Sequence, residues 1–231
     1  MNKIQSDSVV QAIQQIICKY NAVRRVILFG SRGRGDNTVH SDYDIAVFSS
    51  DSEQNTRLKD EFDNIATLNR LDIVFIGERH QGTELYRNIL RDGVDIVNKF
   101  QIKLKNYQKA LDRLYEGIAE AKQSASLTMR DGVIQRFEFT AELAWKTTRE
   151  YLLTLEIMDI NSPKQVMKEA FNNNLLADEQ GWLKILQDRN ATSHIYDEAE
   201  AEEIFARITT KHITLFTALA RVLADKAAKE A

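Results

Sequence analysis

The chain has 231 residues, of which 43% are hydrophobic and 28% charged, with a formal net charge of −3 at pH 7. This composition is typical of a globular protein, which we interpret as two small domains. The small negative net charge excludes a positive potential over the whole surface that would attract nucleic acid, but it does not exclude a local basic patch. A single cysteine, Cys18, excludes an intrachain disulfide, and its place in an amphipathic run predicts a packing role.

The first hundred residues alternate between helical and extended patterns. Apolar residues recur at helical spacing from Val9 to Tyr20, and a continuous apolar run over 26–29 predicts a buried strand that ends at Gly30. The next elements are predicted, in order, as a strand over 42–47, a helix across 58–68, a strand over 71–76, a helix that ends near Gly93 and a brief strand over 94–97. This order is typical of a small α/β unit.

Residues 30–44, GSRGRGDNTVHSDYD, carry the chemistry of this unit. A Gly-Ser step that leaves a strand offers backbone N–H groups and a hydroxyl to phosphate oxygens, so Gly30 and Ser31 are candidates to bind a triphosphate. Asp42 and Asp44 fall on one face of the following strand, roughly 6.5–7 Å apart at Cα. Carboxylates this close repel each other unless a cation lies between them or one is protonated, so the pair predicts a divalent metal site.

Three further residues complete the predicted site. Asp72 is the acid of the strand LDIVFI, where a third carboxylate would bind a second metal ion and help to deprotonate an attacking hydroxyl. Arg32 and Arg34 are candidates to contact the triphosphate or the substrate. Each of these residues also has an interpretation without a functional role. Asp72 could cap the start of its strand or be a surface carboxylate, and either arginine could be a solvated charge at the rim of the site.

From about residue 100 no convincing strand is predicted, and long amphipathic helices follow. The only proline marks a helix start, because Ser162, Pro163 and Gln165 form the pattern of an N-cap, a first-turn proline and a capping-box glutamine. Asp197 is predicted to cap the last helix in the same way. We expect about five helices in this half.

Two charges of the helical half fall on apolar faces of their predicted helices, Glu138 and Arg189. A buried charge needs a partner, so these residues either form a structural ion pair or line a cleft with His194 and Tyr196. Arg189 and His194 lie about 140° apart around a regular helix, so they converge only if the helix ends between them or a symmetric partner supplies a second copy. His212, on the apolar face of the last helix, is expected to be a core or interface histidine.

The N-terminal motifs GSRGRG, SDYDIAV and LDIVFI resemble the minimal nucleotidyltransferase branch of the polymerase-beta-like superfamily, with Gly33 where Ala is usual. This likeness covers about the first hundred residues. It implies triphosphate binding by Gly30 and Ser31, binding of magnesium or manganese by Asp42 and Asp44, and action on an acceptor hydroxyl by Asp72. ATP is the expected donor, with other nucleoside triphosphates left open.

The segments RFEFTAELAWKTTREYLL, SPKQVMKEAF and WLKILQDRNATSHIYDE resemble the nucleotidyltransferase substrate-binding group of HEPN helical proteins, over residues 101–225. In the wider HEPN class, an Arg and a His that match Arg189 and His194 form the site of metal-independent ribonucleases, often at a dimer interface. The tyrosine that matches Tyr196 accepts AMP in toxins that a separate minimal nucleotidyltransferase silences.

Three functions are compatible with these patterns. The first is an enzyme that moves a nucleoside monophosphate, AMP from ATP, onto a hydroxyl of a small molecule, a protein tyrosine or RNA held by the helical half. The second is a single-chain toxin–antitoxin fusion that adenylylates Tyr196 and so restrains a ribonuclease at Arg189 and His194. The third is a binding module without catalysis of its own in the helical half. We expect the first and third together, in a homodimer.

We therefore predict an α+β fold, in which a small mixed-sheet nucleotidyltransferase domain over 1–99 precedes an all-α up-and-down helical bundle over 100–231. No apolar stretch approaches the roughly 20 residues that span a bilayer, and the N-terminal sequence lacks a signal-peptide core. We expect a cytoplasmic protein with no membrane partner.

Overall fold

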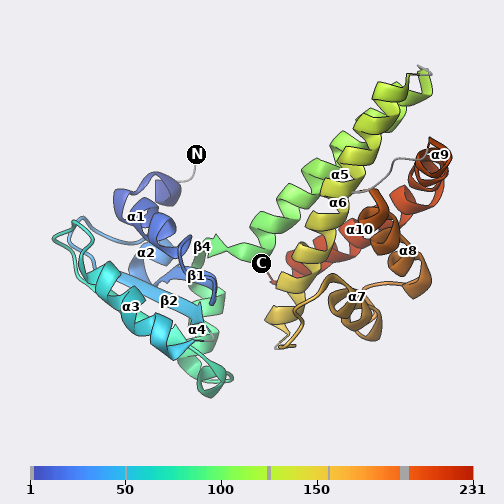
Figure 1. The fold of residues 1–231 in the computed structure, drawn as a ribbon. Coiled ribbons are helices and arrows are strands. Elements are labelled where there is room, and N and C mark those ends of the chain that lie inside the picture. Colours follow the sequence, from blue (N-terminus) through green and yellow to red (C-terminus); the bar gives the residue numbers. More distant parts are fainter. Residues whose placement is uncertain (1–2, 50, 124–125, 156, 193–197, 231) are drawn as a thin grey trace. The chain divides into compact units, whose positions relative to one another are not determined.

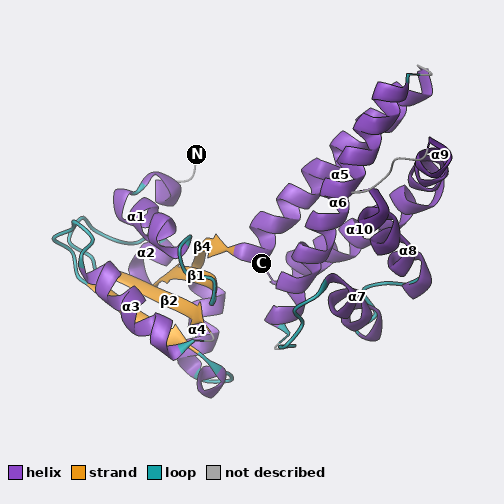
Figure 2. Cartoon of the chain, in the orientation of Figure 1, coloured by secondary structure: helices purple, strands orange, loops and turns teal. Residues whose placement is uncertain are grey.

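The computed structural model describes all residues except 1–2, 50, 124–125, 156, 193–197 and 231 (Figure 1). It divides into two compact units, Met1–Lys99 and Phe100–Ala231, and each unit has its own hydrophobic core. Among the described residues, strands occur only in the first unit, and the second is built from helices (Figure 2). The predicted α+β fold class is confirmed.

The N-terminal unit contains a mixed four-stranded sheet in the order β3-β2-β1-β4. Its strands are β1 (Val23–Phe29), β2 (Tyr43–Ser49), β3 (Leu71–Ile76) and β4 (Val94–Asn98). β1 runs antiparallel to both β2 and β4, whereas β2 and β3 are parallel. The carboxyl-terminal end of β1 therefore lies beside the beginning of β2, which in turn lies beside the beginning of β3.

Helices cover both faces of this sheet. They are α1 (Ser8–Ile17), the short α2 (Gly30–Arg34), α3 (Ser52–Asp63) and α4 (Glu84–Asp92), with 3₁₀ turns η1 (Lys3–Ser6) and η2 (Glu78–His80). α1 and α3 share a core with Ile45 and Val47, whereas α4 packs on the opposite face through Ile89, against Ile27 and Ala46. Alternate residues of β2 thus face different helices.

Two local expectations for this unit were wrong. The helix predicted across 58–68 is α3, which begins earlier, because the Asp51 side chain accepts hydrogen bonds from the backbone N–H groups of Glu53 and Gln54 and so caps it, and which ends earlier, at Asp63. Cys18, which was expected to pack, is exposed at the end of α1.

The described part of the second unit has six α-helices rather than the predicted five or so. They are α5 (Lys99–Gln123), α6 (Leu127–Thr154), α7 (Pro163–Asn172), α8 (Glu179–Thr192), α9 (Glu198–Arg207) and α10 (Ile213–Glu230). A π turn, η3 (Ile208–His212), joins α9 to α10 without a gap. The capping box predicted at Ser162 is present. Within the described ranges, no helix is both long enough and apolar enough to cross a lipid bilayer.

A buried charge network lies at this π turn. Asp188 of α8 and His212 are each 2% exposed, and Asp188 Oδ2 lies 2.7 Å from His212 Nε2. Arg207 donates to both carboxylate oxygens of Asp188, at 2.8 and 3.1 Å, and Lys184 Nζ lies 3.0 Å from Oδ1. The His212 ring stacks on Phe137 with centroids 5.5 Å apart. The expectation of a core histidine is confirmed, and the network ties α8 to α9 and to the π turn.

Candidate functional site

Two of the three predicted acids are direct neighbours in the sheet. Asp44 of β2 and Asp72 of β3 are partners in the parallel register. Their strand positions place them on the face that carries Ala46 and Val74, the side covered by α4. Asp42 lies one residue before β2 begins, and its side chain is exposed. The acids therefore gather at one edge of the sheet, with Asp42 at its rim.

The Gly-Ser step meets this edge from β1. Phe29 pairs with Asp44 across the antiparallel ladder, so the next residue, Gly30, comes against the Asp44 side chain. Gly30 has φ +64°, and a Cβ there would lie 2.1 Å from Asp44 Oδ2. Only glycine meets both conditions without strain. Ser31 follows in the first turn of α2.

Gly33 holds α2 close to its neighbours. A Cβ at this position would lie 2.7 Å from the carbonyl oxygen of Leu28 and 3.0 Å from that of Asp92. The alanine usual in similar motifs would therefore require a backbone shift in this chain. Glycine at this position therefore allows α2 to lie close to the ends of β1 and α4.

The charge on Asp44 is disfavoured in the folded chain. Burial raises the pKa of its carboxyl, repulsion from Asp72 and then from Asp42 raises it further, and Arg34 lowers it only in part. The repulsion that the sequence predicts between these acids is therefore present. A bound cation would relieve it.

The three acids match a divalent cation in the chemistry of their oxygens, because magnesium and manganese prefer carboxylate ligands. Within the described part of the chain, however, no group of three His, Cys, Asp or Glu side chains stands ready to hold a metal ion. Asp72 Oδ1 is paired with Arg70 Nε at 2.7 Å instead. The Arg70 side chain is 74% exposed, so releasing Asp72 from this pair requires little free energy.

Arg32 is 9% exposed and braces the loop that carries Asp42. Its Nε donates to the carbonyl oxygens of Ser41 at 3.1 Å and Asp42 at 3.2 Å, and its Nη2 donates to Ser41 O at 2.8 Å. The guanidinium lies 3.7 Å from the ring centroid of Tyr43 and 3.9 Å from Asp7 Oδ2. Burial and a hydrogen bond to Asp7 raise the pKa of Tyr43 to about 12. These contacts give Arg32 a positioning role, and nucleotide contact stays a prediction.

A second residue, Asn69, braces the same loop. Its Nδ2 donates to the carbonyl oxygens of Val39 at 2.7 Å and Ser41 at 3.0 Å. Asn69 precedes β3, so it couples the loop before Asp42 to the strand that carries Asp72. Arg34, in contrast, is exposed and pairs with Asp36 at 3.2 Å, which leaves it at the rim.

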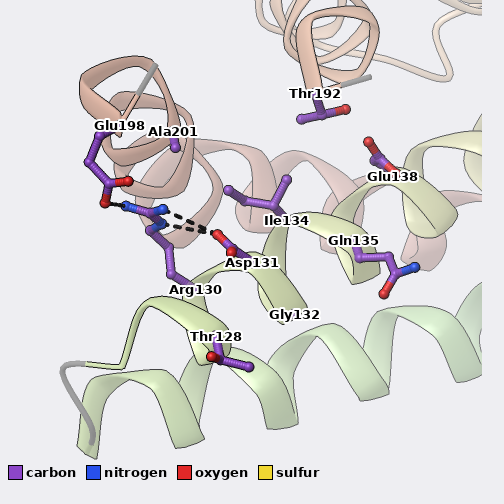
Figure 3. A pocket seen from close by; sticks show the side chains of 10 residues that line it. All are labelled: Thr128, Arg130, Asp131, Gly132, Ile134, Gln135, Glu138, Thr192, Glu198 and Ala201. Atoms are coloured by element: carbon purple, nitrogen blue, oxygen red, sulfur yellow. Dashed lines mark hydrogen bonds and ion pairs between the residues drawn. The ribbon is translucent and has the colours of Figure 1, made fainter. Parts of the chain in front are cut away.

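In the helical unit, Glu138 lines a cavity of about 690 Å³ between α6, the end of α8 and the start of α9 (Figure 3). Its described lining is Thr128, Arg130, Asp131, Gly132, Ile134, Gln135, Glu138, Thr192, Glu198 and Ala201. Arg130 is held by Glu198 at 2.5 Å and Asp131 at 3.2 Å. His194, Tyr196 and the predicted cap Asp197 lie outside the described residues.

Arg189 belongs to a different cavity and a different ion pair. Its Nη2 donates to Glu142 Oε2 at 3.2 Å, and both residues line a cavity of about 280 Å³ formed by α6, α7 and α8. The ion pair of Arg189 with Glu138 was therefore a wrong alternative, since Glu142, one turn further along α6, is the partner. The Arg189 side chain is 40% exposed rather than buried.

Comparison with protein families accounts for both units. Residues 102–225, more than half of the chain, match the family described as nucleotidyltransferase substrate binding protein like. The chain belongs to this family. Residues 11–102 match the family described as polymerase beta, nucleotidyltransferase. The resemblances found in the sequence are confirmed, and the units are a nucleotidyltransferase domain and a substrate-binding domain.

The chain is also similar to individual proteins. A curated protein of Haemophilus influenzae named probable ribonuclease HepT is 34% identical over 85 residues, which cover 35% of this chain and 58% of that protein. The match therefore spans less than two thirds of this relative's length. A Haemophilus influenzae structure, described as a substrate binding domain of a nucleotidyltransferase, covers 52% of this chain and 98% of its own at 25% identity and TM-score 0.48. A Thermus thermophilus crystal structure covers 54% and 98%, at 32% identity and TM-score 0.43.

Proposed function

We propose that this nucleotidyltransferase transfers AMP from ATP to a hydroxyl acceptor held by its substrate-binding domain. The observation that carries the proposal is the register pairing of Asp44 with Asp72, beside the backbone of Gly30. The polymerase beta match supports nucleotidyl transfer in general. The nucleotide and the hydroxyl acceptor are the specific parts of the proposal.

Each predicted residue has a role in this reaction. Asp42, Asp44 and Asp72 would hold magnesium or manganese, which when bound would neutralise charge on the triphosphate. Ser31 and the backbone at Gly30 bind phosphate oxygens. The acceptor oxygen bonds to the α-phosphorus as the bond to pyrophosphate breaks, and pyrophosphate leaves with that electron pair. Asp72, released from Arg70, accepts the hydroxyl proton.

The test is magnesium-dependent release of pyrophosphate from ATP, with mass spectrometry to find the AMP on the protein or on a small molecule. Asp42→Ala and Asp44→Ala should each lower the rate at least about 100-fold, because each removes a ligand of the cation. Asp60→Ala, which removes an exposed acid of α3, serves as the control and should match the parent. Activity that survives both site changes would refute the proposal.

A toxin–antitoxin fusion is the second candidate, and the similarity to a protein named probable ribonuclease HepT favours it. Here the nucleotidyltransferase domain adenylylates Tyr196 and restrains a ribonuclease at Arg189 and His194. Asp44→Ala should make expression harmful, and Arg189→Ala should relieve the harm. Intact-mass measurement after incubation with ATP should show one added AMP on the parent and none on Tyr196→Phe. A parent mass that does not change would rule out the modification.

A further inference from the structure

The cavity beside Arg189 has a mixed apolar and cationic wall. About 280 Å³ in volume, it lies between α6, the first turn of α7 and α8. Its described lining is Ala141, Glu142, Trp145, Ser162, Pro163, Lys164, Leu183, Leu186, Gln187, Arg189 and Asn190. The larger cavity of Figure 3 is lined instead by three acids and by an arginine that two of these acids already engage.

The single acid in the described lining of the smaller cavity is already saturated by donors. Glu142 accepts hydrogen bonds from Trp145 Nε1 at 2.9 Å and Arg189 Nη2 at 3.2 Å, and pairs with Lys146 at 2.8 Å. Burial raises its pKa, but these donors outweigh burial and the net pKa is lowered. Glu142 is therefore ionised, and it orients the indole and the guanidinium rather than attracting a cation from solution.

The remaining charge of the described wall is positive. Lys164 is exposed at the cavity, and Lys146 adds a further positive charge nearby, 5.7 Å from the ring centroid of Trp145. Arg189 has five N–H donors, of which the hydrogen bonds among described residues use two, to Glu142 and Asn190. The first turn of α7 adds the positive end of a helix dipole. These groups favour an anion that accepts several hydrogen bonds, as phosphate does.

The rest of the wall suits a flat apolar group. Trp145 and Leu186 pack against the core from the cavity side, with Pro163 and Leu183 beside them. An indole ring stacks readily on planar heterocycles, nucleobases among them. The volume of about 280 Å³ lies just below the usual range for small-molecule sites, roughly 300–1,000 Å³, which limits the occupant to a small ligand.

We propose that this cavity binds a nucleoside monophosphate, with the phosphate between Lys164 and Arg189 and the base against Trp145. The proposal concerns binding by the substrate-binding domain and does not depend on transfer by the nucleotidyltransferase domain. The same chemistry is offered by a free nucleotide and by the 5′-phosphorylated end of an RNA.

The test is titration of the full chain with AMP in the presence of EDTA, followed by calorimetry and tryptophan fluorescence. AMP should bind saturably and quench fluorescence. Trp145→Phe should abolish the quenching, because the other tryptophan, Trp182, is 2% exposed in the core. Lys164→Ala should weaken binding about 10-fold through loss of a charge-assisted contact. Lys168→Ala, one turn along α7 and outside the lining, is the matched control and should bind like the parent.

Truncated ligands and a site variant separate the alternatives. Adenosine and ribose 5-phosphate should each bind at least about 10-fold more weakly than AMP, since each lacks one contact. If a 5′-phosphorylated oligoribonucleotide binds more tightly than AMP, with the same dependence on Lys164, the ligand of this cavity is the end of an RNA. Otherwise the ligand is a free nucleotide. No saturable binding, equal affinity of the Lys164→Ala and Lys168→Ala variants, or loss of binding in Asp44→Ala alone would overturn the proposal.

Discussion

Asp44 is a predicted metal ligand, and its ionised carboxylate is unfavourable in the folded chain. Burial and repulsion from Asp72 and Asp42 raise its folded-state pKa above the unfolded value. A carboxyl with a raised folded pKa contributes stability below its unfolded pKa, and that contribution is lost as the pH rises through the folded pKa. At neutral pH the ionised Asp44 therefore destabilises the fold.

Asp44→Asn should raise stability at pH 7 while it removes activity. The amide has nearly the same shape beside Gly30 but carries no charge, so we expect a rise of a few degrees in the thermal midpoint. Scanning calorimetry without divalent metal measures this rise, and it should vanish at pH 3. Asp60→Asn should leave the midpoint unchanged. A lower midpoint for Asp44→Asn at pH 7 would show that the carboxylate is stabilised in the fold.

Substitution of Arg32 should lower stability and activity, whereas substitution of Arg34 should leave stability nearly unchanged. Arg32→Ala removes the hydrogen bonds from the guanidinium to the carbonyl oxygens of Ser41 and Asp42, and Ser41 keeps only the one from Asn69 among those described, so the free energy of unfolding should fall by about 2–3 kcal/mol and activity should fall with it. Urea unfolding measures the first effect. Arg34→Ala should change stability by less than about 0.5 kcal/mol, because Arg34 is exposed. Equal stability of the two variants would contradict the positioning role.

Individual residues were predictable where the chemistry is local in the chain. The spacing of Gly30, Asp42 and Asp44 is read from one segment, whereas the braces from Asn69 and Asp7 arise only when distant segments meet. In α8 a helical wheel chose Arg189 as the inward charge, yet the buried positions are Trp182, Ile185 and Asp188, at spacings of three. Adjacent residues differ by about 100° around a helix, so an error of one position exchanged a half-exposed arginine for a buried aspartate.

The π turn between α9 and α10 brings Arg207 and His212 to the same carboxylate. Hydrogen bonds from His212, Arg207 and Lys184 outweigh burial and lower the folded-state pKa of Asp188. This carboxyl therefore adds stability above its unfolded pKa of about 3.9, and the contribution is lost as the pH falls toward the folded value.

Asp188→Asn should destabilise the helical unit by about 3–5 kcal/mol at pH 7, because it removes the buried carboxylate that Arg207, Lys184 and His212 share. Urea unfolding at a series of pH values should show a smaller penalty at acidic pH, where the parent also begins to lose this interaction. Asp225→Asn, which changes an acid of α10 outside this network, should unfold like the parent at every pH. A penalty for Asp188→Asn that does not depend on pH would contradict the ionic explanation.

Most helices and strands were predictable because their apolar periodicity is strong. The start of α3 depends on a single cap, Asp51, which the apolar pattern does not reveal. The π turn adds one residue to a helical turn, so the apolar pattern continues across it with a small change of phase. A sequence pattern registers this as one long helix, which explains the lower helix count predicted.

The molecule as a whole is expected to form a homodimer, on the basis of its single Arg-His pair and its apolar helix faces. Large apolar side chains are exposed on α5 and α6, including Ile102 at 54% and Phe139 at 57%. Light scattering at micromolar concentration should give twice the mass of one chain. Phe139→Arg should lower the measured mass toward that of a single chain. Leu68→Arg, which alters an exposed leucine of the nucleotidyltransferase domain, is the control. A monomeric parent would refute the expectation.

The boundary between the two units falls inside a helix, because α5 begins at Lys99, directly after β4. Lys99 Nζ also donates to the carbonyl oxygen of Tyr20 at 2.6 Å, which anchors the first turn of this helix. Proteases cut exposed extended chain readily and hydrogen-bonded helix poorly. Limited trypsin digestion should therefore spare this junction, although Lys99 itself offers a cleavable bond there.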